Sequence, residues 1–94
     1  MKKDVNYLKA VFWDYPEFTD EERLVRSIPS RGENVELRRW FMYRFLEHGR
    51  AIDALKFFSM EEIKNELPHL KMRPYFKEKW SWITENYAYS NREY

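Results

Sequence analysis

The feature that most constrains the fold is the segment Glu36–Gly49, ELRRWFMYRFLEHG, which has the pattern of an amphipathic helix. At about 100° per residue, its large apolar side chains gather in one sector that is wider than the seam of a coiled coil. The members of this sector are Leu37, Trp40, Phe41, Met42, Phe45 and Leu46. Such a sector is typical of a helix that packs against several neighbours. The segment therefore predicts a central helix around which the chain is built.

Residues at both ends of this segment are those that start and stop helices. Asn34 can accept a hydrogen bond from a free backbone N–H of the first turn. His48 falls in the last turn, where a cation suits the helix dipole, and Gly49 follows it. Opposite the apolar sector we expect a solvent-facing side. Its members are Glu36, Arg39, Tyr43 and Glu47.

Two arginines, Arg38 and Arg44, border or enter the apolar sector. We expect their methylene stems to cover aromatic rings while the guanidinium groups reach water or an acid. For Arg44 the candidate acids are Asp14 and Asp53. Either could form an internal ion pair with it, which would be costly to break.

The length of 94 residues predicts one domain, residues 1–94. A chain this short buries only about 60–65% of its unfolded surface, so its core must be efficient. Seven Phe, seven Tyr and four Trp supply that core. These rings are many for so small an interior. We therefore expect some of them on the surface, where a cluster could bind a partner.

The charge total gives no preference for an anionic ligand, since the chain has 17 basic and 16 acidic side chains. No apolar run approaches the ~20 residues of a membrane span. The first ten residues carry charges without a continuous apolar run, so we expect no signal peptide and a cytoplasmic location. Cysteine is absent, which removes disulfides, thiolate nucleophiles and cysteine-based metal sites.

Residues 1–18 have a mixed pattern. The residues that suit a short helix are Val5, Leu8, Val11 and Phe12, with Asp4 as its cap. Pro16, however, disfavours helical backbone at the residue before it. We predict a short helical turn followed by an irregular strap, which carries Phe12, Trp13 and Phe18 into the core.

Two capping boxes mark the starts of further helices. The first, Thr19 to Glu22, precedes a helix over 20–27, and the second pairs Ser59 with Glu62 before a helix over 60–66. A short helix is expected between them over 50–58. The side chains expected inward in these three helices are Leu24, Val25, Ile28, Ala51, Ile52, Leu55, Phe58, Met60, Ile63 and Leu67.

A last helix is expected to begin at Pro74, because proline suits the first helical position. Its apolar stripe is Phe76, Trp80, Ile83 and Tyr87. Residues 90–94 lack an apolar pattern and are predicted to be a frayed tail. The sequence thus predicts an all-α, compact bundle of four to five short helices with an irregular aromatic strap at its N-terminus.

Catalytic motifs are missing from the sequence. The two histidines, His48 and His69, have no partner that the sequence identifies. The tightest acidic group, Glu61, Glu62 and Glu66, is explained by helix capping and a solvated face. We therefore expect no enzymatic activity, no catalytic or metal-binding residues and no cofactor.

One basic segment offers an alternative function. His69, Lys71, Arg73, Lys77 and Lys79 lie within eleven residues that contain a single acid, and aromatic residues alternate with them. Such a pattern could bind phosphates while an aromatic ring stacks on a base. We favour the simpler interpretation that the aromatics are core residues and the charges their solvated side.

The order of four motifs resembles a family of small prokaryotic proteins. These motifs are Phe12-Trp13-Asp14, Arg44–Gly49 (RFLEHG), Phe58–Leu67 (FSMEEIKNEL) and Lys79-Trp80 with Trp82. The similarity covers most of residues 11–87. Members resemble the small, antitoxin-like partners of nucleotidyltransferase-type toxins related to the AbiEii family. The resemblance implies a protein partner encoded nearby and implies no catalytic residue.

The sequence and this resemblance together lead us to expect a protein–protein interaction module. Its partner would be a nucleotidyltransferase-like toxin or a second copy of the chain. We expect contact through Trp13, Tyr15 and Phe18, with Arg38 or Arg39 as a charged rim, because aromatic residues and arginine dominate interface hot spots. The alternative is nucleic-acid binding by Lys71, Arg73, Lys77 and Lys79.

Overall fold

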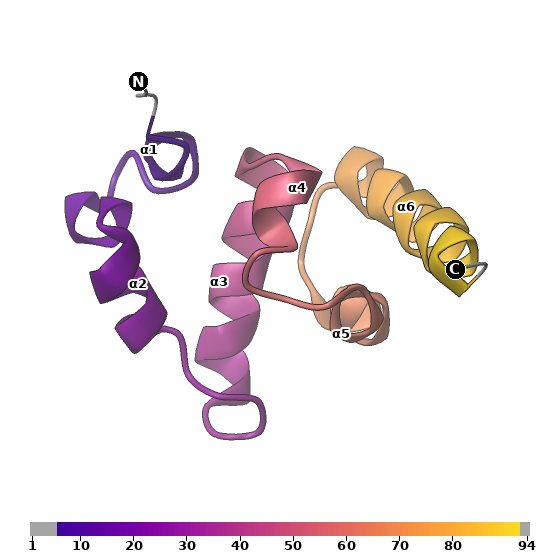
Figure 1. Ribbon diagram of the computed structural model, residues 1–94, viewed down its shortest axis with the longest axis horizontal. Helices are drawn as coiled ribbons and strands as arrows, with labels where there is room; N and C mark the ends of the chain where they lie inside the picture. The colour runs from indigo at the N-terminus through magenta and orange to yellow at the C-terminus, as the bar shows by residue number, and fades with distance from the viewer. Residues whose placement is uncertain (1–5, 93–94) are drawn as a thin grey trace.

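The structure, a computed structural model, describes residues 6–92 and the side chains of residues 6–86. This part of the chain is helical and contains no strand, which confirms the all-α prediction (Figure 1). The elements are α1 (Leu8–Val11), a 3₁₀ helix η1 (Pro16–Thr19), α2 (Glu21–Ser27), α3 (Val35–His48), α4 (Ala51–Ala54), α5 (Met60–Glu66), a 3₁₀ helix η2 (Leu67–His69) and α6 (Pro74–Arg92). None of the described helices is long and apolar enough to cross a membrane.

The predicted central helix, α3, stands in the middle of the fold, with α1 and α2 on one side and α5 and α6 on the other (Figure 1). Four side chains of its apolar sector are almost fully buried: Phe41, Met42, Phe45 and Leu46. Asn34 caps the helix as predicted, because its Oδ1 accepts a hydrogen bond from Leu37 N at 3.1 Å. The sector therefore organises the core on both sides of α3.

Three side chains expected inward are exposed instead. Leu37 (40% exposed) borders an open groove beside η1, and Val25 (54%) points away because α2 buries only Leu24 fully. Ile52 (65%) is exposed because α4 is a single turn, not the predicted helix over 50–58. Short helices have one narrow buried side, so periodicity over few residues overestimates burial.

Glu47 is buried, although it was expected on the solvent side of α3. Its Oε2 accepts a hydrogen bond from the backbone N–H of Arg73 at 3.0 Å, just before α6 begins. On the same stretch of α3, the carbonyl of Leu46 accepts a hydrogen bond from Trp80 Nε1 at 2.9 Å. These two bonds fix the start of α6 against the end of α3.

The N-terminal prediction is correct in outline. A single helical turn, α1, leads into an irregular segment that buries Phe12 fully and Phe18 partly. Trp13 is 59% exposed and does not enter the core, which corrects that expectation. The predicted contributions of Asp4 and Val5 lie outside the described residues.

Both predicted cap regions exist, with one change of residue. Ser59 Oγ accepts a hydrogen bond from Glu62 N at 3.1 Å, as predicted. At α2 the cap is Asp20, which accepts from Glu22 N, while the hydroxyl of Thr19 donates to Pro16 O within η1. The aspartate therefore takes the place of the expected threonine.

The last helix begins at Pro74 as predicted and is longer than expected. Its backbone continues to Arg92, so residues 90–92 are helical rather than frayed. Trp80 is buried, and Phe76 and Ile83 pack partly buried against the core. The side chain of Tyr87, the fourth member of the predicted stripe, lies outside the described part.

Candidate functional site

The guanidinium of Arg44 is the polar centre of the N-terminal half of the molecule. It donates to the backbone carbonyl of Val11 from Nη2 (2.7 Å) and Nε (3.1 Å), and to Asp14 Oδ1 from Nη2. Of the two acids considered for this arginine, Asp14 is therefore the partner. Asp53 instead pairs with Arg50 and lies 3.5 Å from Lys56 Nζ.

Aromatic rings surround the same guanidinium. Its central carbon lies 4.6 to 5.6 Å from the centroids of four rings, which belong to Trp13, Tyr15, Trp40 and Phe12. A cation near the face of such rings is attracted by their quadrupole. The strap therefore wraps around a side chain of α3 and is held in place by it.

Two segments that are distant in the sequence meet at this point. Asp14 of the FWD motif binds Arg44 of the RFLEHG motif, and Gly49 of that second motif lies against Val11. A Cβ atom at Gly49 would stand 2.9 Å from Val11 Cγ2 and 3.0 Å from Phe45 O. Asp14, Arg44 and Gly49 thus have structural roles in this fold.

Beside this centre lies an apolar groove of about 440 Å³ between η1, the end of α2 and the first half of α3. Its lining residues are Tyr15, Glu17, Phe18, Ser27, Leu37, Trp40 and Phe41. We use the name strap surface for the exposed or partly exposed apolar residues in and beside this groove: Trp13, Tyr15, Phe18, Leu37 and Trp40. Two residues from the predicted site, Tyr15 and Phe18, therefore line one groove.

The strap surface has ordered aromatic packing. Tyr15 packs edge-on against Trp40, with ring centroids 5.2 Å apart, and Phe18 contacts Phe41 at the same separation. Trp13 lies edge-on to His48 at 4.8 Å, and the Arg44 guanidinium carbon lies 4.6 Å from its ring centroid. Rings fixed in this way lose little further conformational entropy when they bind a partner.

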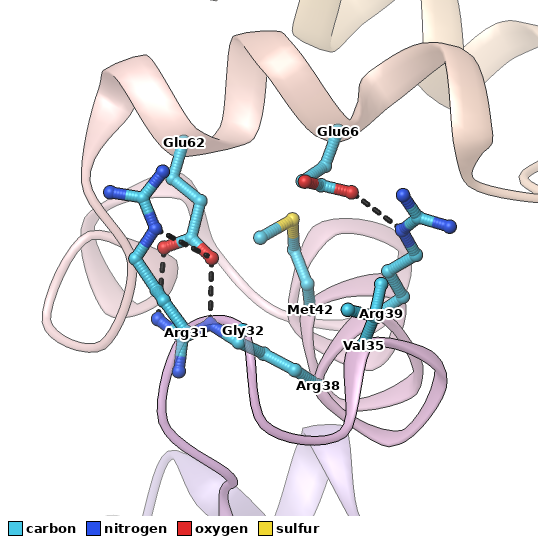
Figure 2. A pocket seen from close by; sticks show the side chains of 8 residues that line it. All are labelled: Arg31, Gly32, Val35, Arg38, Arg39, Met42, Glu62 and Glu66. Atoms are coloured by element: carbon cyan, nitrogen blue, oxygen red, sulfur yellow. Dashed lines mark hydrogen bonds and ion pairs between the residues drawn. The ribbon is translucent and has the colours of Figure 1, made fainter.

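Arg38 and Arg39, the predicted charged rim, lie away from the groove. They face α5 and line a pocket of about 240 Å³, shown in Figure 2. Arg38 Nε and Nη2 donate to the two oxygens of the buried Glu62, and Arg39 Nε donates to Glu66 Oε1. Figure 2 also shows the guanidinium of Arg31 on the far side of the Glu62 carboxylate, with its Nε 3.8 Å from Glu62 Oε2.

Both arginines thus join α3 to α5 within the chain. Arg38 donates in addition to the carbonyl of Pro29, so three of its nitrogens are used internally. The carboxylates of Glu62 and Glu66, expected to serve capping and a solvated face, are the partners of these arginines. Arg38 and Arg39 therefore help to hold α3 against α5. They lie on a different side of α3 from the aromatic residues of the strap surface.

The basic segment of the alternative function is spread over different surfaces. Arg73 is held by Glu47 and covers the ring of Phe76. Lys77 and Lys79 are two residues apart on α6 and therefore point about 200° apart around the helix. Lys77 lines a pocket toward α5, whereas Lys71 and Lys79 are exposed.

His48 lies in the last turn of α3, between Trp13 and Tyr43. Burial lowers the pKa of His48 below its ordinary value, and the nearby Arg44 lowers it further. Burial raises the pKa of the Glu47 carboxyl, but hydrogen bonds from Arg73 outweigh it and hold that pKa below the ordinary range. Glu47 is therefore an anion and His48 a neutral ring near pH 7.

Within the described residues, no group of three or more histidine, aspartate or glutamate side chains is placed to hold a metal ion. His69 is exposed, and so is Glu61. The sequence did not identify the groove, because Leu37 and Trp40 have the pattern of core residues. The position of η1, which leaves Leu37 exposed and Trp40 only half-buried, makes them part of a surface.

The fold and this surface define a small helical protein with an exposed aromatic groove. Comparison with protein family models, with curated proteins and with solved structures returns no match.

Proposed function

We propose that this protein is a protein–protein interaction module whose partner binds the strap surface. The observation that carries the proposal is the groove of about 440 Å³, in which Leu37 and Tyr15 are about 40% exposed although they adjoin the core. Apolar side chains in a concave surface favour an apolar ligand, because their removal from water stabilises the complex.

The chemistry of this surface fits a protein partner. Trp and Tyr are enriched at interface hot spots, and each can bury roughly 150–250 Å². Trp13, Tyr15 and Trp40 lie around one guanidinium, so their positions are set before a partner arrives. An amphipathic helix or an extended segment with apolar anchors would match such a groove.

The family resemblance supports a particular partner. We propose an antitoxin-like role, in which the chain binds a nucleotidyltransferase-like toxin encoded beside it. The proposed contact residues from the sequence are Trp13, Tyr15 and Phe18, to which the groove adds Leu37 and Trp40. Arg38 and Arg39 are engaged with α5, so we propose that they support the scaffold and contribute little directly.

Co-expression with the product of the neighbouring gene tests this proposal. We expect a complex that survives affinity purification and size-exclusion chromatography. Leu37→Glu places a charge in the groove and should weaken association at least tenfold, measured by isothermal titration calorimetry. Trp13→Ala should weaken it severalfold.

The matched control is Ile52→Glu, which introduces the same charge at an exposed aliphatic residue of α4. It should bind the partner as tightly as the unmodified chain. Loss of binding in all three variants, or in none, would contradict the strap surface as the contact. Failure of the two products to associate at all would contradict the antitoxin-like role.

Nucleic-acid binding by Lys71, Arg73, Lys77 and Lys79 stays a prediction, and no observation favours it. It requires retention on DNA or RNA that falls steeply with salt, since each phosphate contact releases counterions. Because Lys77 and Lys79 point in different directions, we expect no binding at 50 mM salt in a fluorescence anisotropy titration.

A further inference from the structure

His48, at the end of α3, contacts one of the proposed partner-binding residues. Its ring lies edge-on to Trp13, with centroids 4.8 Å apart, and the neutral ring of Tyr43 lies 6.0 Å away. The side chain of His48 is 22% exposed, so water still reaches it. The guanidinium carbon of Arg44 lies 4.6 Å from the same Trp13 ring. Trp13 therefore contacts a permanent cation and a second group that becomes a cation in mild acid.

The nearest acids around His48 are already paired with arginines. Glu47 Oε1 lies 3.7 Å from His48 Nε2, while Oε2 of the same carboxylate accepts hydrogen bonds from the backbone N–H and the Nε of Arg73. Asp14, in the strap, is bound to Arg44. A proton on His48 would therefore add a positive charge to groups whose charges balance in pairs.

On its side toward α1, His48 lines a pocket of about 700 Å³ that holds more basic than acidic groups. The charged residues described in this lining are Lys9, Arg50 and Asp53. Asp53 pairs with Arg50, so Lys9 leaves an excess of positive charge. Tyr7 adds no negative charge, because burial raises the pKa of its hydroxyl. This side of the ring therefore also disfavours a proton on His48.

We propose that His48 makes partner binding at the strap surface sensitive to pH, because its neutral form permits binding and its protonated form opposes it. A partner that covers Trp13 also removes water from the adjacent His48 ring. Water stabilises the charged imidazolium, and the described acids nearby already serve arginines, so the complex disfavours the proton. This inference rests on the proposed function, since it adds regulation to the same contact through Trp13.

The direction of the effect follows from linkage between proton binding and partner binding. Because the partner prefers the neutral ring, affinity should be complete near pH 7 and should fall below the ordinary pKa of histidine. Burial and the nearby Arg44 lower the pKa of His48 in the free chain, and the partner should lower it further. We expect the dissociation constant to be about two- to fivefold larger at about pH 5 than at about pH 7.5.

Isothermal titration calorimetry with the product of the neighbouring gene, at both pH values and constant ionic strength, tests the proposal. His48→Asn carries no titratable ring, so the ratio of its two dissociation constants should lie near one, apart from any change that the partner itself causes. The matched control is His69→Asn, which removes an exposed histidine of η2 and should keep the ratio of the unmodified chain. Circular dichroism at each pH verifies folding, and His48→Gln replaces His48→Asn if that variant does not fold.

Nuclear magnetic resonance gives a second measurement on the ring itself. The imidazole proton signals of His48, assigned by their absence in His48→Asn, should titrate at a lower pH in the complex than in the free chain. Equal midpoints, or the same ratio of dissociation constants in His48→Asn and the unmodified chain, would overturn the inference. The proposed function survives either result, because the partner still binds near pH 7.5. Absence of a complex at that pH contradicts the proposed function and this inference together.

Discussion

The guanidinium of Arg44 in α3 bonds the carbonyl of Val11 and the carboxylate of Asp14, 33 and 30 residues earlier in the chain. Val11 is the last residue of α1 and Asp14 lies in the strap, so the bonds hold both the end of α1 and the strap against α3. Arg44 is buried, with 8% of its side chain exposed, whereas Asp14 is 42% exposed. The arginine is therefore the member of the pair on which the fold depends more.

This asymmetry predicts unequal effects of substitution. Arg44→Met leaves the Val11 carbonyl without its donor and should lower the free energy of unfolding by about 2–4 kcal/mol. Asp14→Asn should cost no more than about 1 kcal/mol, because its side chain is half in water. Urea denaturation followed by tryptophan fluorescence measures both. Equal losses would show that the ion pair, and not the buried carbonyl bond, dominates.

The two glycines should respond differently to alanine. At Gly49 a Cβ would press on Val11 Cγ2 and Phe45 O, so Gly49→Ala should cost about 1–3 kcal/mol through displacement of packed atoms. At Gly32, with φ of 88°, nothing lies within 4 Å, and Gly32→Ala should cost about 1 kcal/mol through backbone strain alone. Gly32→Asn is the control, because asparagine tolerates this conformation. Thermal unfolding measures both variants. A larger loss of stability in Gly32→Ala than in Gly49→Ala would contradict the claim that crowding at Gly49 costs more than backbone strain at Gly32.

The cap of α5 should contribute measurably to stability. Ser59→Ala removes the acceptor of the Glu62 N–H bond and should cost about 1 kcal/mol in chemical denaturation. Ser59→Asp should be close to neutral, since aspartate is an equally good cap. Thr19→Ala serves as comparison. Although its sequence matches a capping box, Thr19 bonds Pro16 within η1, so the backbone of α2 keeps its Asp20 cap in that variant.

Stability should fall as the pH drops from about 7 to 5. Burial lowers the pKa of His48 below its ordinary 6.5, so the unfolded chain binds a proton in this range while the folded chain does not. Proton binding therefore favours the unfolded state. The free energy of unfolding decreases as the pH falls below the ordinary pKa of histidine and through the lower pKa that His48 has in the folded chain. His48→Asn should flatten this slope in denaturation curves at several pH values. If the slope is unchanged in His48→Asn, another group causes the pH dependence of stability.

Local patterns in the sequence were enough for most of the secondary structure. The long sector of α3, the Asn34 and Ser59 caps and the start of α6 at Pro74 involve residues within a few positions of each other, so spacing alone predicts them. The single turn of α4 was predicted too long, because 3₁₀-type bonds such as Phe57 N to Ala54 O end it early.

The candidate site was predicted only in part. Aromatic composition indicated that Tyr15 and Phe18 belong to a surface, and the structure does bring them into one groove. Leu37, in contrast, has the spacing of a core residue. Nothing within the sequence of α3 tells that η1 leaves its first turns uncovered.

The sequence by itself determined the longer helices and the Asn34 and Ser59 caps, since these depend on neighbours one or two turns away. The tertiary structure decided which apolar side chains stay in water and which charges are buried. Asp14 instead of Asp53 pairs with Arg44, and Glu47 is covered by the backbone of Arg73. These two pairings join residues 30 and 26 positions apart, and helix periodicity carries no information about which distant segment covers a given side.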